Sequence, residues 1–518
     1  MKHSTNKHCI KYLLTTGLLF VGLGSVSAAE IVIAPMGSVS ATPTSVTQQA
    51  INGMQALGAN VPSAPAWYKG TIPTTDAATY DAQKQQANAA KAAPMAPRAS
   101  TQAASLNGPP VPQFINLAGA SQATSGGWIP ADTNGAAGRT YVCEVTNSHF
   151  DCFTKLQATT QWGTTLAALF GYTAASLFDP RVTYDAEWDR WIVTAEGFPE
   201  AGTGIQRHFV AVSKTSDPTA GTWWIQSVAP TTAAQFWDYP NIGMDRGAIY
   251  ITGNVFNAAG TAFLGSRLFR IPKAQLYNGR GWGSPLWNTA AANGTLVPPM
   301  AVNTKSRVTV FASAPAPSTS VFTYQMYHGV TDAPVFAAGP TVIVPNAVVP
   351  PNAQQPGTVT TIDTLDGRLL GNIYQHDYSI YMMRTIGWAG GATWATAHWV
   401  KISIGGGVLQ ASGSIASTGN SDDFNGTLAV TPAGHVLVGY SSTDRTAVTG
   451  YAPQVRIDGK RSWDAGLGGS SLIYQSPFIY DYGTCSAVRG CRWGDYSSVS
   501  IDPANTLKAW VINETSES

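Results

Sequence analysis

An all-β fold built from repeated sheet units is the fold class that the sequence predicts, and three observations support it. A short phrase, in which an aspartate beside aromatic residues precedes alternating apolar residues, recurs along the chain. Charged residues make up only 11% of the chain, against roughly a quarter in a typical soluble protein. No convincing helix signal follows residue 160. A small sheet unit that recurs along a chain is the signature of a repeat architecture.

The recurring phrase has four recognisable copies. The clearest is WGDYSSVSID at 493–502, where apolar residues alternate with polar ones as in a half-buried strand. The copy WDYPNIGMD at 237–245 has the same interval of seven residues between its aspartates. FDPRVTYD at 178–185 has one residue fewer, and DFNGTLAV at 423–430 is a looser copy. A second apolar run follows each copy, so each one predicts the first two strands of a sheet.

Counting weaker starts, the chain predicts a seven-bladed β-propeller over residues 109–518. The expected blades begin near residues 132, 179, 238, 298, 366, 423 and 495, at intervals of 47 to 72 residues. Sheets arranged radially bury their apolar faces against one another and leave only short edges. The last blade has few strands of its own, so residues 114–117 are expected to supply a strand that closes the ring.

A secretory signal peptide is predicted over residues 1–28. Lys2, Lys7 and Lys11 form a basic region, residues 13–26 are apolar, and small residues follow as at a cleavage site. The apolar run is too short to span a membrane, and no later segment is long and apolar enough to do so. We therefore expect a protein that is secreted, periplasmic or held at the cell surface. A buried N-terminal helix is the less favoured alternative.

Residues 29–108 are expected to form a flexible linker or pro-segment rich in Ala, Gln and Pro. Apolar spacing within 46–57 allows one short helix. Residues 81–105 contain almost no large apolar side chains, and such a segment buries too little surface to order itself. We therefore expect limited proteolysis to remove the chain up to about residue 105. A packed helical domain is the alternative.

The cysteines predict two disulfides. Four cysteines follow the signal peptide, an even number in an exported chain. A two-residue hairpin turn at 147–148 would place Cys143 opposite Cys152, and Cys485 and Cys491 enclose a five-residue loop. Neither spacing is typical of a zinc site. We therefore expect the pairs 143–152 and 485–491 to be oxidised.

The blade phrases resemble those of a group of exported bacterial β-propeller proteins, most of them uncharacterised. The matching motifs are DTNG at 132–135, DPRV at 179–182, DYPNIG at 238–243, PPNA and QPG within 350–357, DGR at 366–368 and RWGDYS at 492–497. The resemblance covers residues 110–513 and implies the fold and export, but no particular reaction. SDPTAGTW at 216–223 and FRIP at 269–272 more weakly resemble phrases of sialidase-type propellers, with different spacing.

The candidate site is the mouth of the central channel, where loops entering the innermost strands of a propeller converge. The candidate ligand-binding residues are Asp179, Asp238, Asp366, Asp495, Trp237, Tyr239, Trp493, Tyr496, Arg181 and Arg368. Carboxylates and aromatic faces suit sugars, because sugar rings stack on aromatic rings and hydroxyls donate to carboxylates. The simpler interpretation is that each aspartate accepts hydrogen bonds within its own turn. In that case the two arginines neutralise the aspartates.

Two functions remain open at this stage. The first is a monomeric, secreted propeller that binds an extracellular glycan or protein ligand at the mouth. The second is an extracellular carbohydrate-active enzyme, either a sialidase-like glycoside hydrolase or a polysaccharide lyase, because paired carboxylates can catalyse glycoside hydrolysis. Binding is favoured because no nucleophile elbow, phosphate loop or HExxH motif occurs.

Charge and cofactor expectations follow from the same residues. The net charge of +1 gives no indication of a nucleic-acid partner. No cofactor is expected, with the exception that clustered carboxylates can hold Ca²⁺.

Overall fold

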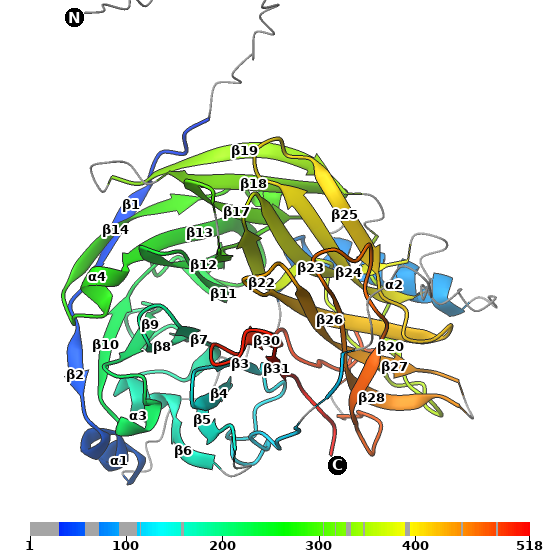
Figure 1. Cartoon of the computed structure of the whole chain (residues 1–518), viewed down its shortest axis with the longest axis horizontal. Coiled ribbons are helices and arrows are strands. Elements are labelled where there is room, and N and C mark those ends of the chain that lie inside the picture. The colour runs from blue at the N-terminus through cyan, green and yellow to red at the C-terminus, as the bar shows by residue number, and fades with distance from the viewer. Residues whose placement is uncertain are drawn as a thin grey trace, which may run out of the picture.

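The structure, a computed structural model, describes residues 31–56, 72–92, 111–113, 115–156, 160–303, 305–315, 318–327, 333–344, 348–388, 394–446, 449–482 and 485–517. Within these residues the fold is all-β and propeller-like, with antiparallel sheets arranged around a centre (Figure 1). The expected signal peptide lies outside the described residues. No helix in the described part of the chain has the length and apolar character that a membrane span requires.

The described residues form four separate sheets of four or five strands, rather than the seven blades expected. The first contains β3 (Asn134–Ala137), β4 (Tyr141–Thr146), β5 (His149–Thr154) and β6 (Thr160–Thr165). The second contains β7 (Leu177–Asp185), β8 (Arg190–Gly197), β9 (His208–Ser213), β10 (Trp223–Val228) and, at its outer edge, β2 (Thr44–Val46). The third contains β15 (Thr295–Val297), β17 (Val308–Ala314), β18 (Ser320–Tyr327) and β19 (Val335–Ile343). The fourth contains β26 (Ser421–Val430), β27 (Val436–Asp444), β28 (Tyr451–Lys460) and β29 (Ser471–Gln475).

A ten-stranded sheet stands where two further blades were expected. One half contains β1 (Gly37–Ala41), β14 (Trp282–Asn288), β13 (Phe263–Pro272), β12 (Ala248–Asn257) and β11 (Gln235–Met244). The other half contains β22 (Leu369–His376), β23 (Ser379–Gly387), β24 (Ala395–Ser403) and β25 (Leu409–Ser414). The two halves are joined by β16 (Pro299–Val302), which pairs in parallel with both β11 and β22.

The position of β16 explains why the expected blade boundaries differ from the observed sheets. β15 and β16 are consecutive, separated only by Pro298. Proline has no N–H to donate, so it interrupts a sheet ladder. β15 stays in the third sheet, whereas β16 leaves that sheet and enters the centre between β11 and β22. The alternation of apolar residues in the sequence carries no signal for this crossing.

Two small sheets complete the described strands. β20 (Ala353–Gln354) pairs with β21 (Thr361–Ile362), and β30 (Ser498–Ile501) pairs with β31 (Ala509–Ile512). β30 contacts both β3 and β26, so it closes the ring between the first and fourth sheets. The strands nearest the centre include β3, β7, β11, β22, β26 and β30 (Figure 1). Residues 115–117 form no strand, and Phe114 lies outside the described residues.

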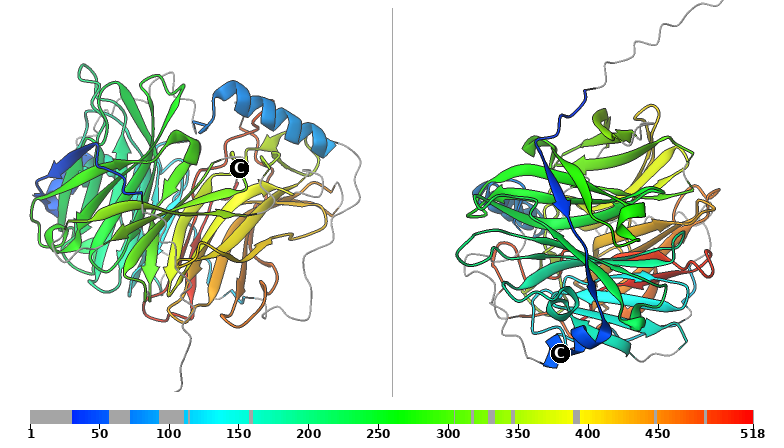
Figure 2. Two further views of the ribbon diagram at one scale, coloured as in Figure 1. Left: turned by 90° about the horizontal axis from the view of Figure 1, so that it is seen from above. Right: turned by 90° about the vertical axis from the view of Figure 1, so that its left-hand side faces the viewer.

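The segment before residue 109 docks on the propeller in its described parts. β1 and β2 add edge strands to two sheets, and α1 (Gln48–Ala56) contacts α3 (Leu166–Phe170). α2 (Ala77–Ala92) lies across one end of the sheets (Figure 2). This differs from the expected linker, because the burial that the segment lacks by itself is supplied by the propeller surface. The remaining short α-helix is α4 (Lys273–Leu276).

Apolar layers lie between neighbouring sheets and hold the inner strands in place. Phe150, Trp191 and Trp223 belong to the layer between the first and second sheets. Trp237 and Phe269 belong to the next layer. Because buried apolar surface stabilises by roughly 25 cal/mol per Å², these tryptophans stabilise the packing of neighbouring sheets around the polar centre.

Candidate functional site

The recurring phrase corresponds to a β-bulge in the innermost strands. The pairing register shifts within β7, β11 and β26, and the first extra residue of each bulge has left-handed backbone: Asp179 (φ 48°), Tyr239 (φ 56°) and Asn425 (φ 48°). A bulge bends the strand and redirects side chains. These three residues are therefore structurally equivalent. Asp179 corresponds to Tyr239, so the sequence analysis, which matched Asp179 with Asp238, was wrong by one residue.

Three carboxylates from two neighbouring sheets meet beside these bulges. Asp179 of β7, Glu196 of β8 and Asp238 of β11 each have a carboxylate oxygen within 4.8 Å of the other two. All three residues are buried. Burial raises the pKa of Asp179 and of Glu196, and the neighbouring carboxylates raise both pKa values further.

Glu196 was missed by the sequence analysis because it lies in a second strand, outside the recurring phrase. The available signal was a single acidic residue at the end of the buried run WIVTAEG. The backbone N–H of Tyr239 acts on Glu196 to lower its pKa, against the effect of burial. Neither carboxylate oxygen of Glu196 has a hydrogen-bond partner of normal geometry among the described residues.

Arginine and tyrosine side chains fill the centre of the ring. The Arg181 guanidinium carbon lies 3.3 Å from the ring centroid of Tyr496, whose own ring centroid is 5.0 Å from that of Tyr239. Arg368 lies over the Tyr239 ring at 4.7 Å. The Tyr496 hydroxyl donates a hydrogen bond to Asp179. This stack joins predicted site residues from four inner strands or their loops, but every member is buried.

The two arginines have different partners. Arg368 donates two hydrogen bonds to Asp366, at 2.8 and 2.7 Å, as the simpler interpretation of the sequence expected. Arg181 instead donates to the Pro240 carbonyl and to Asn241 Oδ1, both at 2.9 Å. The guanidinium of Arg181 therefore holds the bulge of the neighbouring strand.

The remaining predicted residues have structural contacts. The Asp495 backbone N–H donates to Asp132 Oδ1 at 2.8 Å, and burial raises the pKa of Asp132. Trp493 donates its indole N–H to Ser441 Oγ at 3.0 Å, and Trp237 packs fully buried between sheets. In the sequence, Asp132 marked an expected blade start and the DTNG motif, but it was not among the candidate site residues.

The start of α2 approaches Asp366 and Arg368, because Tyr80 lines one pocket with both residues. The buried face of α2 carries Tyr80, Lys84, Ala87 and Lys91, which follow helical spacing. The Lys84 ammonium is completely buried and donates to the Pro350 carbonyl at 3.1 Å. Its other contacts are with acceptors of the loop before β22, the Thr364 hydroxyl at 3.0 Å and Asp363 at 3.2 Å.

Lys91 anchors the other end of this helix. Its ammonium pairs with Asp422 of β26 and donates to the Asn352 carbonyl at 2.6 Å. Burial lowers the pKa of Lys91 to about 8, although the neighbouring Asp422 opposes this shift. Asn88 exchanges hydrogen bonds with the chain as well, donating to the Val488 carbonyl at 2.9 Å. Both buried lysines of α2 thus pair with aspartates of the propeller.

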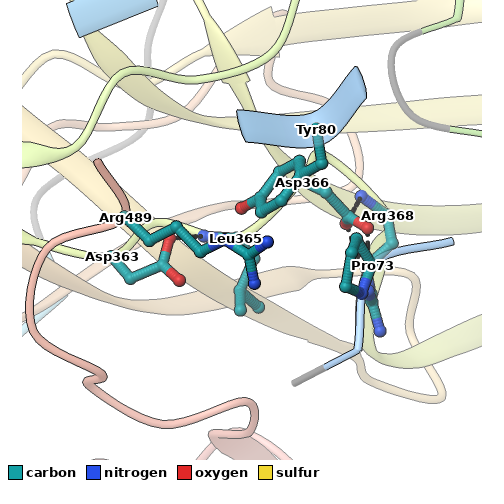
Figure 3. A pocket seen from close by; sticks show the side chains of 7 residues that line it. All are labelled: Pro73, Tyr80, Asp363, Leu365, Asp366, Arg368 and Arg489. Carbon is teal, nitrogen blue, oxygen red and sulfur yellow. Dashed lines mark hydrogen bonds and ion pairs between the residues drawn. The ribbon is translucent and has the colours of Figure 1, made fainter. Parts of the chain in front are cut away.

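A small pocket remains between α2 and the mouth (Figure 3). It is lined by Pro73, Tyr80, Asp363, Leu365, Asp366, Arg368 and Arg489. Its free volume is about 10 Å³, room for about one water molecule. The structure therefore brings the predicted aspartates together at the centre but encloses them, with Asp179, Asp238, Asp366 and Asp495 only 2–5% exposed.

A larger groove lies between the strands β24 and β25 of one sheet and β28 of the next. Its free volume is about 200 Å³, and its lining includes Trp399, Ser414, Asp458 and Ser470. The Asp458 carboxylate accepts backbone hydrogen bonds from Gly459 and Gly469. The sequence analysis missed this groove because its two walls are separated along the chain and share no motif.

Burial raises the pKa of Asp458 to about 6, against the effect of its backbone donors. Because this folded-state pKa exceeds the ordinary value of 3.8, the carboxyl contributes stability that is present below pH 3.8 and lost as pH rises through 6. This loss amounts to about 2–3 kcal/mol in the free energy of unfolding, and we expect Asp458→Asn to abolish it. Urea unfolding of both proteins at several pH values measures it, and parallel pH profiles for the two would contradict the assignment.

Both expected disulfides are present. Cys143 and Cys152 are directly opposed on β4 and β5, with their Cα atoms 4.1 Å apart. Cys485 and Cys491 also have Cα atoms 4.1 Å apart. The second bridge fixes the loop that carries Arg489 toward α2.

Comparisons with known proteins give structural similarity only. No family model and no curated protein sequence matches the chain. An α-L-arabinanase of Penicillium chrysogenum in complex with arabinobiose is 11% identical over 46% of this chain and 69% of that one, with a TM-score of 0.31. A mutant Trypanosoma rangeli sialidase displaying trans-sialidase activity is 11% identical over 66% and 52%, with a TM-score of 0.33. A hypothetical selenium-binding protein of Sulfolobus tokodaii is 8% identical over 65% and 74%, with a TM-score of 0.37. At these identities the likeness concerns the fold alone.

Proposed function

We propose that the protein is an exported, monomeric β-propeller that binds an extracellular carbohydrate in the groove between β24–β25 and β28. The observation that carries this proposal is a groove of about 200 Å³ whose lining includes the edges of Trp399 and Asp458, each 5% exposed. Sites for drug-sized ligands measure about 300–1,000 Å³, so this groove suits one or two sugar units. The two disulfides agree with export to an oxidising compartment.

The lining favours a neutral sugar. An aromatic ring offers a face on which the apolar side of a sugar ring packs, while carboxylate and hydroxyl oxygens accept from sugar hydroxyls. Ser414 and Ser470 line opposite walls, and their hydroxyls already hydrogen-bond with His398 and with Tyr440 and Arg456, respectively. Among the described residues that line the groove, Asp458 is the charged one, so an anionic sugar would meet repulsion.

The geometry favours binding over hydrolysis. Glycosidases place two carboxyl groups about 5–9.5 Å apart on either side of the scissile bond. The described lining of the groove contains one carboxylate. The carboxylates of Asp179, Glu196 and Asp238 are closer to one another and are enclosed, which leaves no space for a sugar between them. A carbohydrate-active enzyme therefore remains the second candidate.

Ligand contact by the channel-mouth residues stays a prediction. A ligand could reach Asp366 or Arg368 only after residues 72–80 move, because Ile72 and Thr74 hydrogen-bond to these two buried side chains and Tyr80 lines the same pocket. We also propose that the ten-stranded sheet represents two blades joined by β16, and that β30–β31 is a reduced last blade. This interpretation restores a sevenfold ring.

Glycan-array screening of the purified protein, followed by calorimetry, tests the groove. We expect Trp399→Ala to weaken binding about thirtyfold, as for an aromatic residue that carries about 2 kcal/mol of binding energy. Trp463→Ala is the matched control, because Trp463 is 68% exposed and does not line the groove. Asp458→Asn provides a second variant that keeps the packing of Trp399. If Trp399→Ala and Asp458→Asn both bound sugar as tightly as the wild type, the groove would not be the site. Release of sugar products by the wild type would favour the carbohydrate-active enzyme instead.

A further inference from the structure

The three enclosed carboxylates have the geometry of a cation site. Oxygens on opposite sides of a calcium ion lie about 4.6–5.2 Å apart, because each bonds at 2.3–2.6 Å. One oxygen from each of Asp179, Glu196 and Asp238 lies within 4.8 Å of the other two. One ion can therefore contact all three carboxylates. The other grouping of acidic and sulfur side chains, around Asp481, contains the disulfide-bonded Cys485 and Cys491, which are not available as thiolates.

An unsatisfied side chain gives independent support for a ligand. Glu196 has 0% exposure, and neither of its carboxylate oxygens has a hydrogen-bond partner of normal geometry among the described residues. Leaving a buried carboxylate without a partner is costly, so such groups are paired or bind metals. The hydroxyl of Thr194, two residues earlier in β8 and hence on the same face, also lacks a partner in the described chain.

Negative charge exceeds positive charge around the three carboxylates when they are ionised. Arg181 is the arginine whose charge acts on both Asp179 and Glu196, and its own hydrogen bonds go to Pro240 and Asn241. When ionised, the three carboxylates (−3) outweigh Arg181 (+1) in a place closed to solvent, and the nearby Asp495 adds further negative charge beside Asp179. A divalent cation offsets this negative charge.

We propose that Asp179, Glu196 and Asp238 bind one Ca²⁺ ion that joins β7 and β8 to β11. The all-oxygen donor set suits a hard cation. Calcium is favoured over magnesium, because magnesium usually keeps several waters and this cluster is enclosed by side chains. The ion would hold two neighbouring sheets together at the centre of the ring, independently of sugar binding in the groove.

Calcium content and thermal unfolding test the site. The full-length protein is unfolded and refolded with its disulfides intact, either with EGTA or with CaCl₂, and then dialysed. We expect one calcium per chain in the second sample by elemental analysis, and a melting temperature that rises with free calcium, because a ligand of the folded state stabilises it. Glu196→Gln should weaken calcium affinity at least about tenfold, since even changes beyond the ligands cost ten- to a hundredfold. Glu187→Gln, at the exposed turn between β7 and β8, is the matched control and should behave as the wild type.

A second measurement guards against a Glu196→Gln protein that fails to fold. Terbium replaces calcium in oxygen sites, and the Tyr496 ring beside Asp179 is placed to sensitise its luminescence. We expect terbium luminescence from the wild type that calcium displaces. A wild-type protein that retains no calcium and gives no displaceable luminescence would overturn the proposal. So would a folded Glu196→Gln protein with unchanged calcium affinity.

Discussion

Asp422→Ala is expected to lower the free energy of unfolding by about 3–5 kcal/mol, the usual cost of leaving one partner of a buried ion pair alone. Asp422 is completely buried and pairs with the equally buried ammonium of Lys91 on α2. It also accepts backbone hydrogen bonds from Gln354 and Ala395, both at 2.9 Å. The substitution therefore strands a charge and two N–H donors inside the protein. Guanidinium unfolding of the variant measures the loss.

Two controls separate this effect from a general loss of packing. Asp422→Ala combined with Lys91→Met should recover part of the stability, because removing both partners of a buried pair costs much less than removing one. Glu187→Ala removes an exposed pair with Arg246 and should cost less than about 1 kcal/mol. If Asp422→Ala cost no more than Glu187→Ala, α2 would not be anchored through Lys91.

The sequence predicted the inner strands because their signal is local. The alternating residues after each aspartate do form β7, β11, β26 and β30. The register within them was wrong by one residue at Asp238, because a bulge adds a residue without changing the apolar pattern. The Asp366–Arg368 pair was also predictable, since its members are two residues apart.

The parts of the site that the sequence could not predict depend on distant residues. The partners of Lys91 and Lys84 lie 261 to 331 positions away in the chain. No local pattern can therefore distinguish these lysines from solvated ones. The Ala- and Gln-rich segment that contains α2 was expected to lack order for the same reason. The contacts that bury its lysines are made with the propeller, not within the segment. The groove of Trp399 and Asp458 likewise exists only after two sheets pack together.

Reversing both α2 anchors is expected to release the helix from the channel mouth. In the double variant Lys84→Glu and Lys91→Glu, each new carboxylate would face Asp363 or Asp422 at the position of a buried ammonium. Burying two unpaired acids beside two others is far more costly than exposing the helix, since each broken pair alone costs about 3–5 kcal/mol. We expect amide hydrogen exchange within residues 77–92 to become at least about a hundredfold faster, while exchange in β11, which contacts neither lysine, stays slow.

The matched control carries new acids on the other side of the same helix. Gln85 and Gln86 are exposed, so Gln85→Glu with Gln86→Glu adds charge without touching the propeller, and exchange in α2 should stay slow. Slow exchange in the Lys84→Glu, Lys91→Glu variant would contradict the docking of α2. In the released variant, Tyr80 leaves the pocket beside Asp366 and Arg368, and we expect the adjoining residues 72–74, which also contact this pair, to leave with α2, which makes the predicted mouth testable. A glycan bound there but not by the wild type, and lost again on Asp366→Asn, would assign ligand binding to the mouth as well as to the groove.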